Sequence, residues 1–190
     1  MKKLFFFLLI MQCTICLRVF SQAAGSGGNG ALADGSRGIK SGMAAPDFTG
    51  KDQNGNTVSL SQYKGKKVVL YFYPKDDSPG CTAEACSLRD NYDSLTRAGY
   101  TILGVSTDDQ TSHTNFKEKY HLPFTLIADV DTSINKLYNV WVEKERDGNK
   151  YWGTARTTFV INEKGIIVNK IDKVDTKQHA QQILSFDPGQ

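Results

Sequence analysis

The chain has 190 residues, of which 39% are hydrophobic, 11% aromatic and 23% charged. This length and composition fit one globular domain with a buried core, and they exclude a fibrous, collagenous or wholly disordered chain. The formal net charge is +3, but the first 23 residues hold Lys2, Lys3 and Arg18 and no acid, so the remainder sums to zero. The basic balance is therefore no argument for nucleic-acid binding, and we expect no nucleic-acid partner.

The first 23 residues have the layout of a secretory signal peptide. Lys2 and Lys3 form a basic start, and an apolar block follows over residues 4–17. Small residues at Ser21 and Ala23 then offer a cleavage site. A membrane span needs about 20 apolar residues, more than this block supplies, so a retained membrane anchor is the less favoured interpretation. We therefore expect an exported, periplasmic protein that loses this segment.

The segment that follows, residues 24–42, is rich in Gly, Ser and Asn. Such a composition buries too little apolar surface to offset the entropy of ordering, so we interpret the segment as a flexible linker. The folded domain is expected over residues 43–190. Two of the four cysteines lie in the expected signal peptide, so the domain keeps only Cys81 and Cys86.

The rest of the chain alternates between strand and helix patterns. Asn54-Gly55 indicates a hairpin turn, and the apolar run 68–73 is typical of a strand covered on both faces. Further strands are expected over 101–106, 124–128, 156–162 and 166–171, with helices from Cys81 towards Gly99 and over 113–120, 133–138 and 176–186. The charged segment 143–150 is interpreted as a solvated loop. This order predicts a three-layer α/β domain with a mixed sheet.

The segment 71–86, YFYPKDDSPGCTAEAC, brings the candidate chemistry together. Pro74 ends the buried strand, and Cys81 stands where a helix begins. The first turn of a helix presents unpaired N–H groups and a positive dipole end, which favour the thiolate, the nucleophilic form of cysteine. Ser78 adds a hydroxyl three residues upstream that can donate to this thiolate or accept a proton from a substrate.

The second cysteine, Cys86, is five residues further along the same expected helix. In a helix that spacing puts the two Cα atoms roughly 8 to 9 Å apart. A disulfide needs about 4.4–6.8 Å. Either no bond joins the pair, or the first turns of the helix unwind. The large apolar residues Leu88, Tyr92 and Leu95 lie further along, so we expect few core contacts in those first turns.

In these motifs the chain resembles the peroxiredoxins, and most closely the peroxiredoxin Q subfamily, also called bacterioferritin comigratory proteins. The likeness extends over residues 43–186, and its most specific part is P-x-x-x-S-x-x-C, matched by Pro74, Ser78 and Cys81. The resemblance implies a thioredoxin-like fold and a thiol peroxidase that reduces hydrogen peroxide and organic hydroperoxides without a cofactor.

The resemblance also implies a role for each site residue. Cys81 attacks the peroxide and becomes a sulfenic acid, and Cys86 resolves it as an intramolecular disulfide. Arg156 polarises the peroxide and holds the thiolate, although the bare sequence would make it an ordinary surface ion-pair residue. Thioredoxin or a thioredoxin-like reductant recycles the enzyme, which we expect to be a monomer.

One function from another class is also compatible with these cysteines. An exported, thioredoxin-like thiol–disulfide oxidoreductase acting on proteins would use C-x-x-C, whereas four residues separate Cys81 from Cys86, which favours the peroxidase. The histidines His113, His121 and His179 have no ligand spacing, so we expect neither a zinc site nor a Cys-His hydrolase, and no metal or other cofactor.

Overall fold

The computed structural model describes residues 38–186. Its main sheet consists of β1 (Thr49–Asp52), β2 (Thr57–Ser59), β3 (Lys67–Phe72), β4 (Tyr100–Ser106), β5 (Thr125–Ala128), β8 (Thr157–Ile161) and β9 (Ile167–Ile171). A separate pair consists of β6 (Trp141–Arg146) and β7 (Asn149–Thr154). The helices are η1 (Leu60–Tyr63, a 3-10 helix), α1 (Pro79–Asp90), α2 (Tyr92–Arg97), α3 (Gln110–Lys119), α4 (Ser133–Leu137) and α5 (His179–Leu184).

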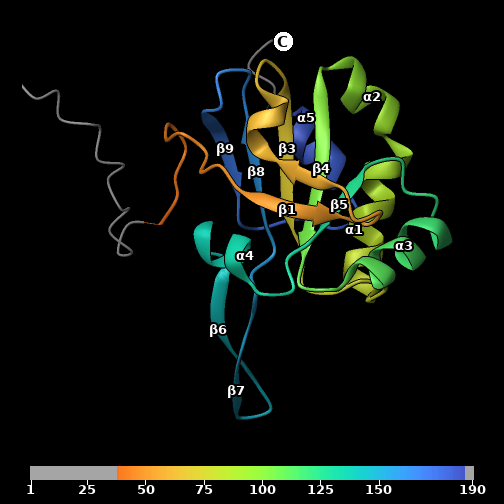
Figure 1. Ribbon diagram of the computed structural model, residues 1–190, viewed down its shortest axis with the longest axis vertical. Coiled ribbons are helices and arrows are strands. Elements are labelled where there is room, and N and C mark those ends of the chain that lie inside the picture. The colour runs from red at the N-terminus through yellow and green to blue at the C-terminus, as the bar shows by residue number, and fades with distance from the viewer. Residues whose placement is uncertain (1–37, 187–190) are drawn as a thin grey trace, which may run out of the picture. The chain divides into compact units, whose positions relative to one another are not determined.

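The main sheet has seven strands in the order β2-β1-β5-β4-β3-β8-β9 (Figure 1). Strand β3 lies parallel to β4 and antiparallel to β8, so the sheet is mixed, as the alternating pattern predicts. The side chains of β3 alternate between two cores because successive residues of a strand face opposite sides. One core includes residues of α1, α2, α3 and α5, and the other includes residues of η1 and α4. The predicted three-layer α/β architecture is therefore confirmed.

Several local predictions hold with shifted ends. The turn at Asn54-Gly55 joins β1 to β2, and Gly55 has the positive φ of 81° that such a turn requires. Helix α1 begins at Pro79, two residues before the predicted start, because proline suits the first turn of a helix. The expected continuous helix towards Gly99 is interrupted at Asn91, which separates α1 from α2.

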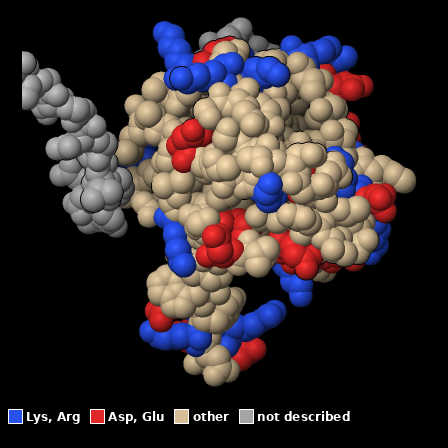
Figure 2. Space-filling view, viewed as in Figure 1, with Lys and Arg blue, Asp and Glu red and all other residues tan. Residues whose placement is uncertain are grey.

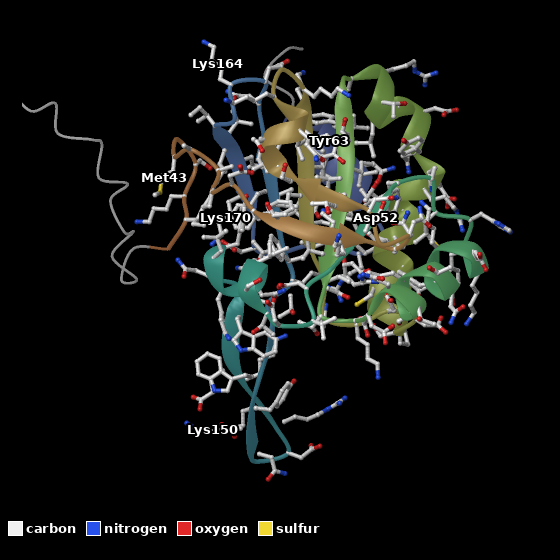
Figure 3. All side chains as sticks on the ribbon, in the orientation of Figure 1. Met43, Asp52, Tyr63, Lys150, Lys164 and Lys170 are labelled. Atoms are coloured by element: carbon white, nitrogen blue, oxygen red, sulfur yellow. The ribbon has the colours of Figure 1, made fainter. Side chains whose placement is uncertain are left out.

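The interpretation of residues 143–150 as a solvated loop is wrong. They form most of the β6–β7 hairpin, which extends beyond the main sheet in Figure 1. The missed signal is Asp147-Gly148, whose φ angles of 53° and 77° are those of a two-residue hairpin turn. Charged residues of both signs lie along the hairpin (Figure 2), and Lys150 lies on it away from the main sheet (Figure 3). The charges concealed the strands because both faces of this hairpin carry exposed side chains.

The packed part of the chain begins before Met43. Ile39 is buried, with 6% of its surface exposed, and the Gly42 amide donates to the Ile167 carbonyl at 2.8 Å. The predicted linker therefore ends earlier than residue 42, while the expected signal peptide, residues 1–23, lies outside the described residues. Between residues 38 and 186, none of the helices combines the length and apolar character that crossing a bilayer requires.

Candidate active site

Cys81 lies where an interior strand of the sheet is followed by a helix. Strand β3 ends at Phe72, the loop 73–78 follows, and Cys81 is the third residue of α1. The Thr82 amide donates to the Ser78 carbonyl at 2.8 Å and so begins the helix. The Cys81 thiol is free and only 1% of the residue is exposed. Cys81 therefore lies at the predicted helix start and is also almost completely buried. Nearby charges interact strongly with a group in such a buried position.

Arg156 is 75 residues from Cys81 in the sequence but lies beside it in the fold. Strand β8 pairs antiparallel with β3 and sets Thr157 opposite Phe72, which brings the preceding Arg156 to the end of β3. Its Nη2 donates to the Cys81 sulfur at 3.2 Å. The structure thus brings together two of the predicted site residues.

Glu84 is a member of this cluster that the sequence prediction missed. It is fully buried on α1, one turn beyond Cys81, and its Oε2 pairs with Nη1 of Arg156. Burial works to lower the pKa of Arg156, but the charges of Glu84 and Cys81 outweigh burial and raise it above its usual value. The missed signal was the stripe of Cys81, Glu84, Ala85 and Leu88, whose spacing of three and four places an acid on the buried helix face.

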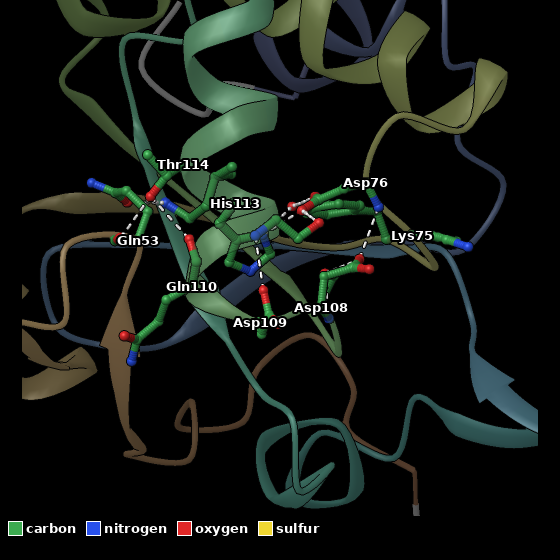
Figure 4. Close-up of polar contacts among 12 residues, drawn as sticks. Gln53, Lys75, Asp76, Asp108, Asp109, Gln110, His113 and Thr114 are labelled. Carbon is green, nitrogen blue, oxygen red and sulfur yellow. Dashed lines mark hydrogen bonds and ion pairs between the residues drawn. The ribbon is translucent and has the colours of Figure 1, made fainter.

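A second buried network fixes the loop that carries Pro74 and Ser78 (Figure 4). Asp76 accepts from the Tyr73 hydroxyl and the Ser112 hydroxyl, each at 2.8 Å, and lies 2.8 Å from Nδ1 of His113. Because Ser112 and His113 belong to α3, the loop is tied to a neighbouring helix. His113, for which no role was predicted, therefore holds the segment that leads into Cys81.

Ser78 is oriented differently from the expectation. Its hydroxyl donates to the Lys75 carbonyl at 3.0 Å, within its own loop. In the hydrogen bonds of residues 38–186, the donor to the Cys81 sulfur is Arg156 and not Ser78. The Ser78 oxygen keeps its lone pairs, so it can accept a proton from a bound molecule. Pro74 is partly buried in the same loop.

Cys86 is a free, partly exposed thiol on the same helix as Cys81. Since α1 continues unbroken from Pro79 to Asp90, the two cysteines keep the helical spacing, too long for a disulfide. The structure therefore does not bring Cys86 to Cys81. The expectation of few core contacts in the first turns is wrong, because Cys81, Glu84 and Ala85 are all buried there.

The hairpin contributes one further cation. The Lys144 ammonium donates to the Thr154 carbonyl at 2.5 Å. Burial, and then the charge of Arg156, lower the pKa of Lys144, while Cys81 acts in the opposite direction. The charges of Arg156 and Cys81 therefore influence the ammonium group of Lys144. In the described part of the chain, no three residues among His, Cys, Asp and Glu gather as metal ligands.

The fold and the site together define a class: α/β proteins that place a buried thiol at a helix start, beside an arginine. The sequence profile of the AhpC/TSA family matches residues 41–170. A peroxiredoxin bcp of Coxiella burnetii is 48% identical over 146 residues, which are 77% of this chain and 97% of that protein. Peroxiredoxin Bcp of Bacillus subtilis is 44% identical over 146 residues, covering 77% of this chain and 93% of that protein.

Solved structures agree with this match. A structure of the Xanthomonas campestris bacterioferritin comigratory protein, concerned with its alkyl peroxide reduction activity, is 33% identical with a TM-score of 0.70. The similarity covers 74% of this chain and 89% of that one. The chain belongs to the AhpC/TSA family, within it to the peroxiredoxin Q (Bcp) proteins, and it is a thiol peroxidase with the thioredoxin-like fold.

The comparisons correct the prediction of an exported, periplasmic enzyme. The matched region accounts for 97% and 93% of the two bacterial relatives, so these proteins consist of the domain almost alone. They offer no counterpart to the expected signal peptide, and the prediction is wrong.

Proposed function

We propose that this peroxiredoxin reduces hydrogen peroxide and organic hydroperoxides through Cys81 as the attacking thiolate and Cys86 as the resolving thiol. The observation that carries the proposal is the 3.2 Å contact between the Cys81 sulfur and Nη2 of Arg156 at the start of α1. A guanidinium and a helix start both favour the thiolate, the form of cysteine that acts as a nucleophile. The alkyl peroxide activity of the Xanthomonas relative supports the organic substrates.

In the first step, the Cys81 thiolate attacks one oxygen of the peroxide. The O–O bond breaks, the sulfur is oxidised to a sulfenic acid, and the departing oxygen takes a proton to leave as water or an alcohol. Arg156 can serve both partners because its planar guanidinium presents several donors in a fixed arrangement. One nitrogen faces the sulfur, another is held by Glu84, and the remaining N–H groups are available to the peroxide. The Ser78 oxygen is the acceptor for the peroxide O–H.

In the second step, the Cys86 thiolate attacks the Cys81 sulfur, the S–O bond breaks, and hydroxide leaves and is protonated to water. Helix geometry requires the first turns of α1 to unwind for this attack, because the two Cα atoms are too far apart in the helix. The disulfide is then reduced by two electrons from a thioredoxin-like dithiol, the reductant that peroxiredoxins use. Both cysteines belong to one chain, so we propose that a monomer completes the cycle.

Two cysteine variants of the full chain test the assignment. Cys81→Ser should abolish peroxide turnover, since a serine hydroxyl is not ionised at neutral pH. Cys86→Ser should still reduce about one peroxide per chain and then stop at sulfenic acid, which further peroxide over-oxidises. Rapid-quench mass spectrometry follows both species. If folded Cys86→Ser fails to react even once, the two roles are wrongly assigned.

A further inference from the structure

His179 is a fully buried histidine that the proposed chemistry leaves without a role. It is the first residue of α5, which packs against α1. Its Nδ1 lies 3.2 Å from Oε1 of Glu84, and its Nε2 lies 3.0 Å from the hydroxyl of Thr158 on β8. Of the two ring nitrogens, Nδ1 therefore faces the acid and Nε2 faces the hydroxyl. A buried polar side chain with such defined partners calls for a reason.

The contact between His179 and Glu84 completes a chain of four groups that ends at the reactive sulfur. Cys81 is held by Arg156, Arg156 by one oxygen of Glu84, and the other oxygen faces His179. Neither Oε1 of Glu84 nor Nδ1 of His179 makes an aligned hydrogen bond within residues 38–186, and the two atoms lie 3.2 Å apart. His179 thus lies beside the carboxylate oxygen of Glu84 that does not pair with Arg156.

The position of Glu84 between Cys81 and Cys86 gives this contact a second consequence. Any unwinding that brings Cys86 to Cys81 must move Glu84, and so break its contacts with Arg156 and His179. The later part of α1 has separate ties to α5. The Ala180 amide donates to the Ser87 hydroxyl at 3.3 Å, and Gln181 donates to Asn91 at 3.4 Å. Residues from Ser87 onward therefore stay attached when Glu84 leaves.

We propose that His179 is a positioning residue that acts through Glu84. It holds Arg156 against Cys81 for the attack on peroxide, and it holds the first turns of α1 folded until Cys86 moves to attack the sulfenic acid. This inference rests on the proposed roles of Cys81 and Cys86. It follows that weakening the contact has opposite effects on two steps. Oxidation of Cys81 slows because Arg156 is less well held, while formation of the disulfide speeds up because the helix opens more readily.

Two substitutions in the full chain separate this role from simple packing. His179→Asn places an amide nitrogen where Nδ1 was and keeps a donor for Glu84. His179→Gln places its amide near Nε2, towards Thr158, and loses the donor to Glu84. In His179→Gln we expect oxidation of Cys81 to be about tenfold slower and disulfide formation about tenfold faster, because the close polar contact with Glu84 is lost. His179→Asn should remain within about threefold of wild type in both steps.

Rapid-quench mass spectrometry measures both steps in one experiment, and over-oxidation at high peroxide should fall in His179→Gln because resolution competes better. Unchanged rates in His179→Gln, or both steps slowed alike in the two variants, would overturn the inference. Should His179→Gln fail to fold, Glu84→Gln takes its place and must show the same opposed changes; unchanged or parallel rates there also overturn it. If wild type forms no Cys81–Cys86 disulfide, the proposed function fails instead.

Discussion

Two buried histidine–carboxylate pairs flank the reactive cysteine, and they differ in strength. Before Cys81, Asp76 and His113 lie 2.8 Å apart in an aligned contact, and Tyr73 and Ser112 also donate to Asp76. After Cys81, Glu84 and His179 lie 3.2 Å apart without an aligned hydrogen bond.

The difference indicates that the loop before Cys81 stays in place while the helical turns after it move when the disulfide forms. The loop 73–78 must keep its shape in every state, because it carries Ser78 and sets the start of α1. The first turns of α1 must open for Cys86 to reach Cys81, so a weaker hold is suitable there. Local opening of this kind requires a segment whose contacts are less stable than the rest of the fold.

The largest expected effect concerns the stronger pair. His113→Leu removes one of the three groups that contact the buried Asp76 side chain, and a buried charged group that loses a partner destabilises a protein by about 3 kcal/mol. Urea denaturation should therefore detect a lower free energy of unfolding. The control is His121→Gln, because His121 is exposed and should stay within about 0.5 kcal/mol of wild type. Equal stability of the two variants would mean that the loop is not held by this pair.

The next effect concerns Arg156, which the weaker pair positions. Arg156→Lys keeps the charge but loses the planar arrangement that contacts Cys81 and Glu84 together. Loss of one such donor slows a reaction by about a hundredfold, so stopped-flow peroxide reduction should slow to that extent. Lys144→Arg is a matched control, since it keeps a cation on the neighbouring hairpin. A rate for Arg156→Lys equal to wild type would return Arg156 to an ordinary ion-pair residue.

The smallest effect is a local change in hydrogen exchange. Oxidation to the Cys81–Cys86 disulfide should speed amide exchange over about residues 81–86, because these turns unwind. Strand β3 should stay protected, and so should the loop 73–78, because Asp76 and His113 hold it in both states. Comparing reduced with oxidised protein measures this directly. Faster exchange in the loop as well would erase the contrast between the two pairs, and unchanged exchange in 81–86 would rule out the unwinding.

The sequence alone predicted the parts of this protein that depend on neighbours along the chain. The apolar run 68–73 predicts a buried strand, and Pro74, Ser78 and Cys81 follow it at fixed offsets. The turn-forming pair Asn54-Gly55 also predicted the turn between the first two strands. The same rule should have found the hairpin at Asp147-Gly148, but its charged flanks favoured a loop. Periodicity predicted the existence of α1, α3 and α5. The ends of α3 and α5 shifted by up to three residues, while α1 stops at Asp90 instead of continuing towards Gly99.

Only the tertiary structure decided which distant side chains meet Cys81. Arg156 lies 75 residues away in sequence and arrives because β8 pairs with β3. His179 arrives because α5 packs on the same face of the sheet as α1. Only the family resemblance had pointed to Arg156, and nothing in the sequence pointed to His179, since a lone arginine and a lone histidine are common on any surface. For Arg156, burial strengthens the interaction of its charge with Cys81 and Glu84 by removing water that would screen it.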